Sequence, residues 1–294
     1  MIKSGTIVRA FSPAGTYWRS NFVCDSAAYV NEGDLIFSAC HFDEDTLPDN
    51  TGWRGEFYEP TVEELCLLAS LSLPIGYTDG ILQIYPLRTS YRLPEKLSFS
   101  EKEAIAEISN QIRKDPRFNT RASWRNDIPP PVFGGCEYSY RHAPPPQEIQ
   151  NRIFARIDSA DSLLMRGIGA FIQGGMLSCH GSLFSAAHYA LYISLDASFE
   201  LVRREMVNSG FLNPSAVEVG DYFARAVGDS PTGQPYFSDY YEDRIRTFHT
   251  ASRFGASPHL PLGHSDFFLL YYALREVYRF IILAERVDLA DASD

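Results

Sequence analysis

The segment from Tyr240 to Gly255 carries the residues whose types and spacing could perform chemistry. It reads YYEDRIRTFHTASRFG, so Arg244 is followed five positions later by His249. A histidine can take up or release a proton in a reaction, and an arginine can stabilise negative charge on a transition state. Arg244 and His249 are therefore the candidate catalytic residues of this chain.

The position of Arg244 also has purely structural interpretations. Helical spacing places it on a stripe with four large side chains, Phe237, Tyr241, Ile245 and Phe248. A buried guanidinium is costly without a partner, so Arg244 either pairs with a nearby carboxylate or faces a cleft or a subunit interface. Alternatively, the aliphatic part of the Arg244 side chain is buried while its guanidinium reaches solvent. His249 could simply cap the end of the helix.

On an ideal helix, the side chains of Arg244 and His249 point about 140° apart, because each residue turns the helix by about 100°. They can converge only if the helix ends near Thr250 to Ser252 or if a second subunit supplies one of them.

The elements that must position this pair belong to two different halves of the chain. In residues 1–114, short β-prone runs such as GTIVRAF, NFVC, DLIFSACHF and ILQIYPL are separated by glycine, proline and aspartate, which predicts strands and turns. One helix is expected from Pro60 through Leu71, and another opens at Ser100 with Glu103 completing a capping box. We predict an α+β N-terminal domain over 1–114.

Residues 115–150 contain the runs IPPPVFGG and APPPQE. Prolines remove backbone donors and fix φ, so this stretch is predicted to be a connector between two folding units.

Residues 151–290 have the period of amphipathic helices, which predicts an all-α, up-down helical bundle. The first helix is expected to start at Asp158 or Ser159 and to stop at Gly174–Gly175. The others are expected at about 177–207, 215–227, 236–248 and 266–287.

An Arg-x4-His motif late in a bundle, before a Pro/Gly loop and a last long helix, resembles the HEPN superfamily (higher eukaryotes and prokaryotes nucleotide-binding). The matching residues are Arg244 and His249, with Tyr240 or Tyr241 upstream, and the similarity covers about 158–287. The resemblance implies metal-independent cleavage of RNA by a homodimer that forms through the bundle, so that the motifs of the two subunits face each other. Substrate is expected to contact Tyr241, Arg246 and Arg253. A defence or toxin role with a cognate antitoxin is one setting for such an enzyme.

A second interpretation makes the bundle a non-catalytic HEPN-like module that binds a nucleotide, RNA or a protein and serves for dimerisation. Ile245 favours it, because active relatives usually have a polar residue after the arginine. The net charge of −11 also weighs against non-specific coating of nucleic acid.

A metal-dependent hydrolase is a third and weaker interpretation. His180, His188, His259 and His264 are available, but no H-x-x-x-H or H-E-x-x-H spacing occurs. His188 falls on an apolar stripe and is expected to be a core histidine. Because Walker and dinucleotide glycine patterns are missing too, we expect neither metal nor cofactor.

Five scattered cysteines, without a C-x-x-C pair, favour a reducing cytoplasm over a disulfide framework. The start MIKSGTIVRAF has no signal-peptide core, and no run approaches the length of a membrane span. The sequence therefore predicts a cytoplasmic protein that does not contact membranes.

Overall fold

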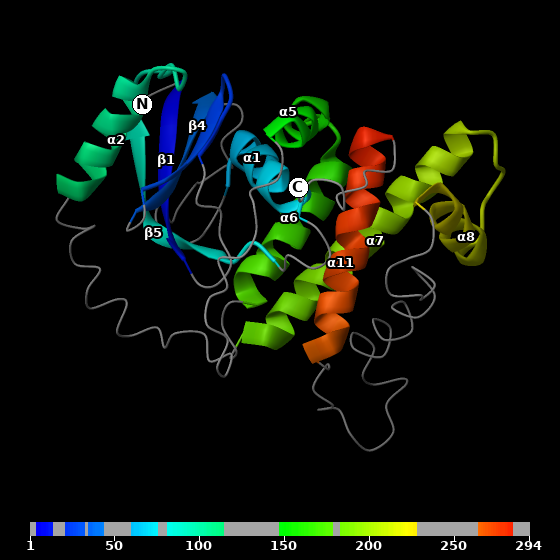
Figure 1. Cartoon of the computed structure of the whole chain (residues 1–294). Helices are drawn as coiled ribbons and strands as arrows, with labels where there is room; N and C mark the ends of the chain where they lie inside the picture. Colours follow the sequence, from blue (N-terminus) through cyan, green and yellow to red (C-terminus); the bar gives the residue numbers. More distant parts are fainter. Residues whose placement is uncertain are drawn as a thin grey trace, which may run out of the picture.

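The computed structural model places an antiparallel sheet at one end of the molecule and a group of helices at the other (Figure 1). It describes residues 4–13, 21–32, 35–43, 60–75, 81–114, 147–178, 183–227 and 264–284. The expected succession of an α+β part and a mainly helical part is confirmed at this level.

Over the described residues, the sheet has five strands in the order β2-β3-β4-β1-β5, and all neighbours are antiparallel. The strands are β1 (Ser4–Pro13), β2 (Phe22–Val23), β3 (Ala27–Asn31), β4 (Ile36–Asp43) and β5 (Ile84–Leu93). The first strand of the chain is thus internal, with β4 on one side and β5 on the other.

Among the described elements, α1 (Val62–Ser72) packs on one face of the sheet and α2 (Lys102–Lys114) on the other. Successive side chains of a strand point to opposite faces. Accordingly, Ile7 and Phe11 belong to the core on the α1 side, whereas Val8 and Ala10 pack with the apolar face of α2. Burial on both sides explains why the strands read as almost continuous apolar runs.

A buried ion pair joins α1 to the sheet. Arg9 of β1 and Glu64 of α1 are 6% and 1% exposed, and Arg9 Nε donates to both carboxylate oxygens of Glu64, at 3.0 and 3.1 Å. Ser38 is the partner of Arg9 in β4, and its hydroxyl also donates to Glu64, at 3.1 Å. Thr61 caps the helix by accepting the backbone N–H of Glu64, so the start of α1 is fixed over the middle of the sheet.

The helical part comprises α5 (Gln147–Arg156), α6 (Ser162–Ser178), α7 (Phe184–Asn208), α8 (Ala216–Val227) and α11 (His264–Leu283). The expected apolar stripes of α7 and α11 are directed inward, as shown by Leu191 and Leu195 on α7 and by Leu274 and Tyr278 on α11, all fully buried. Prediction of α8 and α11 is confirmed to within a few residues at each end.

Three expectations about the starts and stops of helices are wrong. Helix α6 begins at Ser162, with Asp161 as its cap in place of Asp158 or Ser159. Helix α6 does not stop at Gly174–Gly175 but continues to Ser178. A Cβ on Gly174 would lie 2.6 Å from Leu191 Cδ2, so the glycine permits close packing of α6 on α7 rather than ending the helix. Helix α7 in turn begins at Phe184 and not near 177.

The expected connector 115–150 is also too long, because α5 starts at Gln147, directly after the last prolines. Ile153 of this helix is fully buried. Burial of one apolar face stabilises a helix that is otherwise short and strongly polar.

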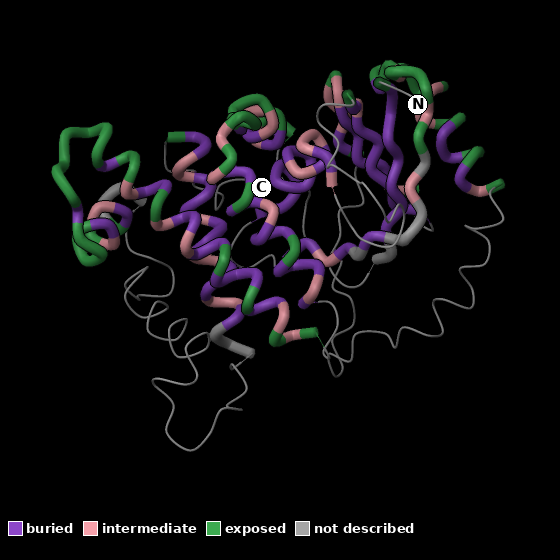
Figure 2. Tube along the Cα trace, turned by 180° about the vertical axis from the view of Figure 1, so that it is seen from behind, coloured by how far each residue is buried: buried purple, intermediate pink, exposed green. Residues whose placement is uncertain are grey.

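One hydrophobic core contains residues from the sheet, from α1 and from α5, α6, α7 and α11. Helix α1 packs directly on α5 and α6, and the buried residues run from the strands into the helices (Figure 2). The division of the chain into two domains near residue 150 remains a prediction. The described elements before and after residue 150 contribute to the same hydrophobic core.

Polar groups lock the contact among α6, α7 and α11. The Tyr278 hydroxyl donates to the Ser194 carbonyl at 3.0 Å, and the Ser194 hydroxyl donates to the Gly167 carbonyl at 3.0 Å. All of these groups are buried. Burial also raises the pKa of Tyr278, since the ionised phenolate would be poorly solvated there.

Candidate functional site

The candidate site residues inferred from the sequence lie outside the described residues. Residues 228–263 include Arg244 and His249, the expected substrate-binding residues Tyr241, Arg246 and Arg253, and the helix expected at 236–248. Their roles stay predictions.

The prediction for His188 can be examined, because α7 is described. It is 1% exposed, its Nδ1 lies 3.1 Å from the Phe184 carbonyl oxygen, and its ring contacts those of Phe184 and Phe267. His188 is therefore a core residue, as expected.

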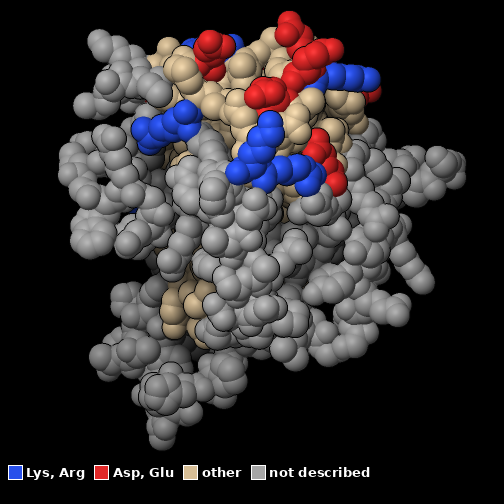
Figure 3. All heavy atoms as spheres, turned by 90° about the vertical axis from the view of Figure 1, so that its left-hand side faces the viewer, with Lys and Arg blue, Asp and Glu red and all other residues tan. Residues whose placement is uncertain are grey.

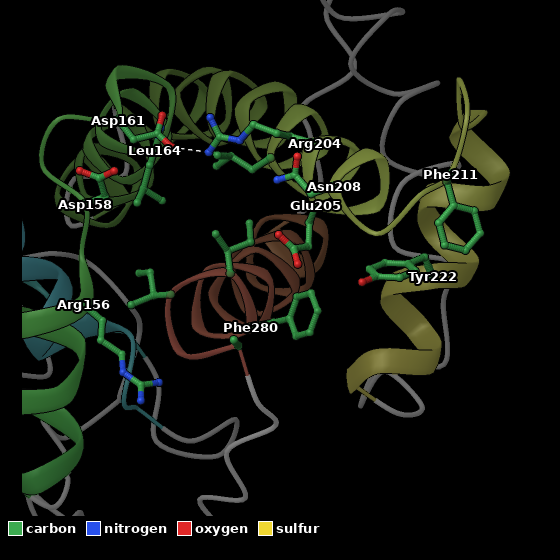
Figure 4. Close-up of a pocket in the computed structure, with 14 residues that line it drawn as sticks. Arg156, Asp158, Asp161, Leu164, Arg204, Glu205, Asn208, Phe211, Tyr222 and Phe280 are labelled. Carbon is green, nitrogen blue, oxygen red and sulfur yellow. Dashed lines mark hydrogen bonds and ion pairs between the residues drawn. The ribbon is translucent and has the colours of Figure 1, made fainter.

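A cavity of about 730 Å³ opens where α5, α7, α8 and α11 meet (Figure 4). Its lining residues come from the end of α5, the α5–α6 turn, the start of α6, the last turns of α7, the α7–α8 turn, α8 and the end of α11: Arg156, Asp158, Asp161, Leu164, Leu201, Arg204, Glu205, Asn208, Phe211, Tyr222, Phe280, Ile281, Ile282 and Ala284. Cavities of this size are large enough for a small organic ligand.

Aromatic rings form one side of this cavity. The ring centroids of Phe211 and Tyr222 are 6.0 Å apart, and those of Tyr222 and Phe280 are 6.4 Å apart, both with edge-to-face geometry. In Figure 4 the hydroxyl end of Tyr222 and the carboxylate of Glu205 both point to the space beside Phe280. A ligand placed there would meet ring faces and a carboxylate together.

The turn between α7 and α8 brings these rings into place. Gly210 has φ +96°, in the left-handed region that favours glycine, and the N–H of Phe211 donates to the Met206 carbonyl at 3.1 Å. Helix α8 then begins after Ser215, whose hydroxyl and N–H both donate to Glu218 at 2.7 Å in a capping arrangement. The reversal of the chain sets Tyr222 opposite Phe211 and the end of α7.

The opposite side of the cavity carries an ion pair between Arg204 of α7 and Asp161, which caps α6. Asp161 Oδ1 accepts the backbone N–H groups of Leu163 and Leu164, at 3.1 and 3.2 Å. The hydrogen bond from Arg204 is the main reason why the pKa of Asp161 is lowered, and these backbone donors act in the same direction. Asp161 is thus held as a carboxylate, and it forms an ion pair with the guanidinium of Arg204.

Arg156 is occupied as well. Its Nη1 donates to the Leu283 carbonyl oxygen at 2.7 Å, near the end of α11. The described lining thus has two guanidinium groups, each with a partner, and three carboxylates, those of Asp158, Asp161 and Glu205. This balance favours a ligand that donates hydrogen bonds or carries positive charge.

The described lining contains no His, Cys, Ser, Thr or Lys, so it offers no paired nucleophile and base. Across the described residues, no group of His, Cys, Asp and Glu is arranged to hold a metal ion. The site can bind and orient a ligand through its aromatic rings and its carboxylates.

The sequence reasoning did not find this cavity. Its residues are scattered over 156–284 and share no motif. The available signal was local: Phe211 and Tyr222 flank the turn sequence NPS, and RRE (203–205) lies in the last turns of α7.

The surface around α2 carries both signs of charge (Figure 3). Arg113 Nη2 lies 3.1 Å from Glu32 Oε2, and Lys96 Nζ lies 2.9 Å from Asp43 Oδ1. Acidic and basic groups alternate over the described part of this face, unlike the basic surface typical of proteins that coat nucleic acids.

Comparison with family models, with curated proteins and with solved structures finds no match for this chain. None of the described helices has the length and apolar character needed to span a membrane.

Proposed function

We propose that the helical part of this chain is a ligand-binding module that holds a nucleoside with an amino-substituted base, guanine above all, in the cavity at the end of α7. The observation that supports this proposal is the placement of the rings of Tyr222 and Phe280 beside the carboxylate of Glu205. This function is that of the non-catalytic HEPN-like module inferred from the sequence, and we propose that the module also forms a homodimer.

Stacking on the aromatic rings would hold any base, and hydrogen bonds to the carboxylate would select guanine. Stacking of a base on an aromatic side chain contributes about 1–3 kcal/mol and is tolerant of sequence. Guanine presents its N1–H and its amino group along one edge, and both can donate to a single carboxylate such as that of Glu205. Adenine and uracil offer fewer donors on that edge, so they should bind more weakly.

The phosphates of a nucleotide should contribute little to binding in this cavity. Arg204 and Arg156 are already engaged, by Asp161 and by the Leu283 carbonyl. A phosphate would also meet the charges of the carboxylates. We therefore expect guanosine and its monophosphate to bind with similar affinity.

Isothermal titration of the full chain with guanosine, adenosine and guanosine monophosphate tests the proposal. A bidentate contact to a base edge discriminates by about 1–3 kcal/mol, so Glu205→Gln should weaken guanosine binding about 5- to 150-fold. Tyr222→Leu should weaken all nucleosides. Glu200→Gln is the matched control, because Glu200 lies on the same helix, pairs with Arg203 and is not part of the cavity lining.

The proposal is wrong if no nucleoside binds at millimolar concentration, or if Glu205→Gln and Tyr222→Leu leave the affinities as they are.

A second proposal, metal-independent cleavage of RNA, is supported by the sequence alone, through Arg244 and His249. A histidine could move the proton of a ribose 2′-hydroxyl, and an arginine could stabilise the pentavalent phosphate. Cleavage of mixed RNA in excess EDTA that is lost in both Arg244→Ala and His249→Ala would support it. Intact RNA with the wild-type protein would leave the binding module as the function.

A further inference from the structure

The described lining of the candidate cavity carries more negative than positive charge. Asp158, Asp161 and Glu205 supply three carboxylates, whereas Arg156 and Arg204 supply two guanidinium groups. Arg204 pairs with Asp161, and this hydrogen bond is the main cause that raises the pKa of Arg204, while the charges of Asp158 and Glu205 act in the same direction. The three carboxylates thus surround one guanidinium, and a cationic ligand would complete the balance of charge.

Aromatic rings stand beside the carboxylate that is farthest from this ion pair. The rings of Phe211, Tyr222 and Phe280 lie on the side of the cavity toward which Glu205 points (Figure 4). Phe211 is 43% exposed, so the protein covers its ring only in part. The face of an aromatic ring attracts a cation that lies within about 6 Å of its centroid. Rings and a carboxylate at one place favour a flat cation over a flat neutral molecule.

The side-chain hydrogen-bond donors of the described lining are few. Besides the two arginines, they are the Asn208 amide and the Tyr222 hydroxyl. Guanine has two acceptors on its major-groove edge, N7 and O6, and each loses its hydrogen bonds to water when the base leaves solvent. A base without an acceptor at N7 suits this lining better, because the two donors then need to serve only O6.

We propose that the base held in this cavity is an N7-methylated guanine, a purine with a full positive charge. The inference rests on the nucleoside-binding function proposed above and names its ligand more closely. Methylation at N7 removes that acceptor and leaves the N1–H and the amino group free to donate to Glu205. Because the donors then belong to a cation, their hydrogen bonds to the carboxylate become stronger. The charge of the base also adds its attraction to the rings of Tyr222 and Phe280.

Isothermal titration of the full chain with three nucleosides tests this inference. They are guanosine, N7-methylguanosine and 7-deaza-7-methylguanosine, which has the methyl group but no charge. The titrations are done at mildly acidic pH, where N7-methylguanosine keeps its N1 proton and its positive charge. From the strength of cation–π contacts, N7-methylguanosine should bind about 2- to 30-fold more tightly than either of the other two.

Variants of the cavity show whether the rings and the carboxylate cause this preference. The ratio of the affinities for N7-methylguanosine and guanosine should fall in Glu205→Gln and in Tyr222→Leu. It should be retained in Tyr222→Phe, which keeps the ring, and in the control Glu200→Gln, whose carboxylate pairs with Arg203 outside the cavity lining. Phe211→Leu, at an exposed position, gives a second test of the rings that does not depend on the folding of Tyr222→Leu.

The possible failures of this inference and of the proposed function are distinct. Equal affinity for guanosine and N7-methylguanosine would overturn the inference and leave the guanosine-binding module in place. Equally tight binding of the neutral deaza analogue would also overturn it, because the methyl group and not the charge would then be the cause. Absence of binding by all three nucleosides would overturn the proposed function together with the inference.

A further arm of the titration identifies the source of the methylated base, which is either a free nucleoside or the end of an RNA chain. The probe is a dinucleotide in which N7-methylguanosine is joined to guanosine through a 5′–5′ triphosphate. Binding as tight as that of N7-methylguanosine would support the proposal with an RNA end as the ligand. Binding of the nucleoside alone would support it with the free nucleoside as the ligand.

Discussion

Replacing Glu64 with glutamine should destabilise the protein strongly. The substitution keeps the shape of the side chain but removes the charge that pairs with Arg9 Nε at 3.0 Å, and Arg9 is 6% exposed. The guanidinium of Arg9 would remain buried without its counter-charge. Breaking a buried ion pair in this way costs about 3–5 kcal/mol.

Urea unfolding followed by circular dichroism measures this loss. With a dependence on urea of about 3 kcal/mol per molar, the midpoint of Glu64→Gln should fall by about 1–1.7 M. The control Asp43→Asn breaks the pair with Lys96, whose side chains are 55% and 44% exposed, and it should cost no more than about 1 kcal/mol.

The double variant Arg9→Met, Glu64→Leu separates an unmatched charge from lost packing. Apolar residues of similar volume often replace a buried pair at little cost, so the double variant should be more stable than Glu64→Gln. A loss below about 1 kcal/mol in Glu64→Gln, or a double variant less stable than the single one, would refute the reasoning.

Two further predictions concern α6 and α1. Gly167→Ala should destabilise the protein by about 1–3 kcal/mol, because the new Cβ would collide with the Tyr278 hydroxyl. The control is Gly169→Ala, whose Cβ would lie 3.8 Å from Leu65 Cδ1. In the same urea titrations the control should be neutral or stabilising by up to about 1 kcal/mol. Burial raises the pKa of the Cys66 thiol from 9.0 to about 12. Its stabilising effect is thus complete below pH 9 and declines as the pH rises from 9 toward 12. The urea midpoint should fall less between pH 8.5 and 10.5 in Cys66→Ala than in wild type; equal slopes would contradict this account.

Periodicity was sufficient to predict most described elements, because a helix or strand with one buried face repeats its apolar residues. The stripe through Leu191 and Leu195 predicts α7, and that through Leu274 and Tyr278 predicts α11. Glycine was misleading at Gly174, where the same residue type that ends helices also lets two helices approach closely. The distinction depends on Leu191, which is 17 residues away, and local sequence cannot supply it.

The candidate cavity and the buried charges could not be predicted for a related reason. Arg9, Ser38 and Glu64 come together only through the register of β1 on β4 and the position of α1. Arg204 and Tyr222 become parts of one cavity only through the turn at Gly210. The sequence pointed to Arg244 as a buried arginine, and this residue lies outside the described residues. Among the described residues, Arg275 and Arg279 of α11 are buried arginines.

The internal position of β1 has a consequence for synthesis of the chain on the ribosome. Its partner β4 ends at Asp43, but its other partner, β5, ends only at Leu93. At about 5–20 residues per second, translation from Pro13 to Leu93 takes about 4–16 s. During that interval one edge of β1 has no strand beside it, so the nascent chain has an open apolar edge that could pair with another nascent chain.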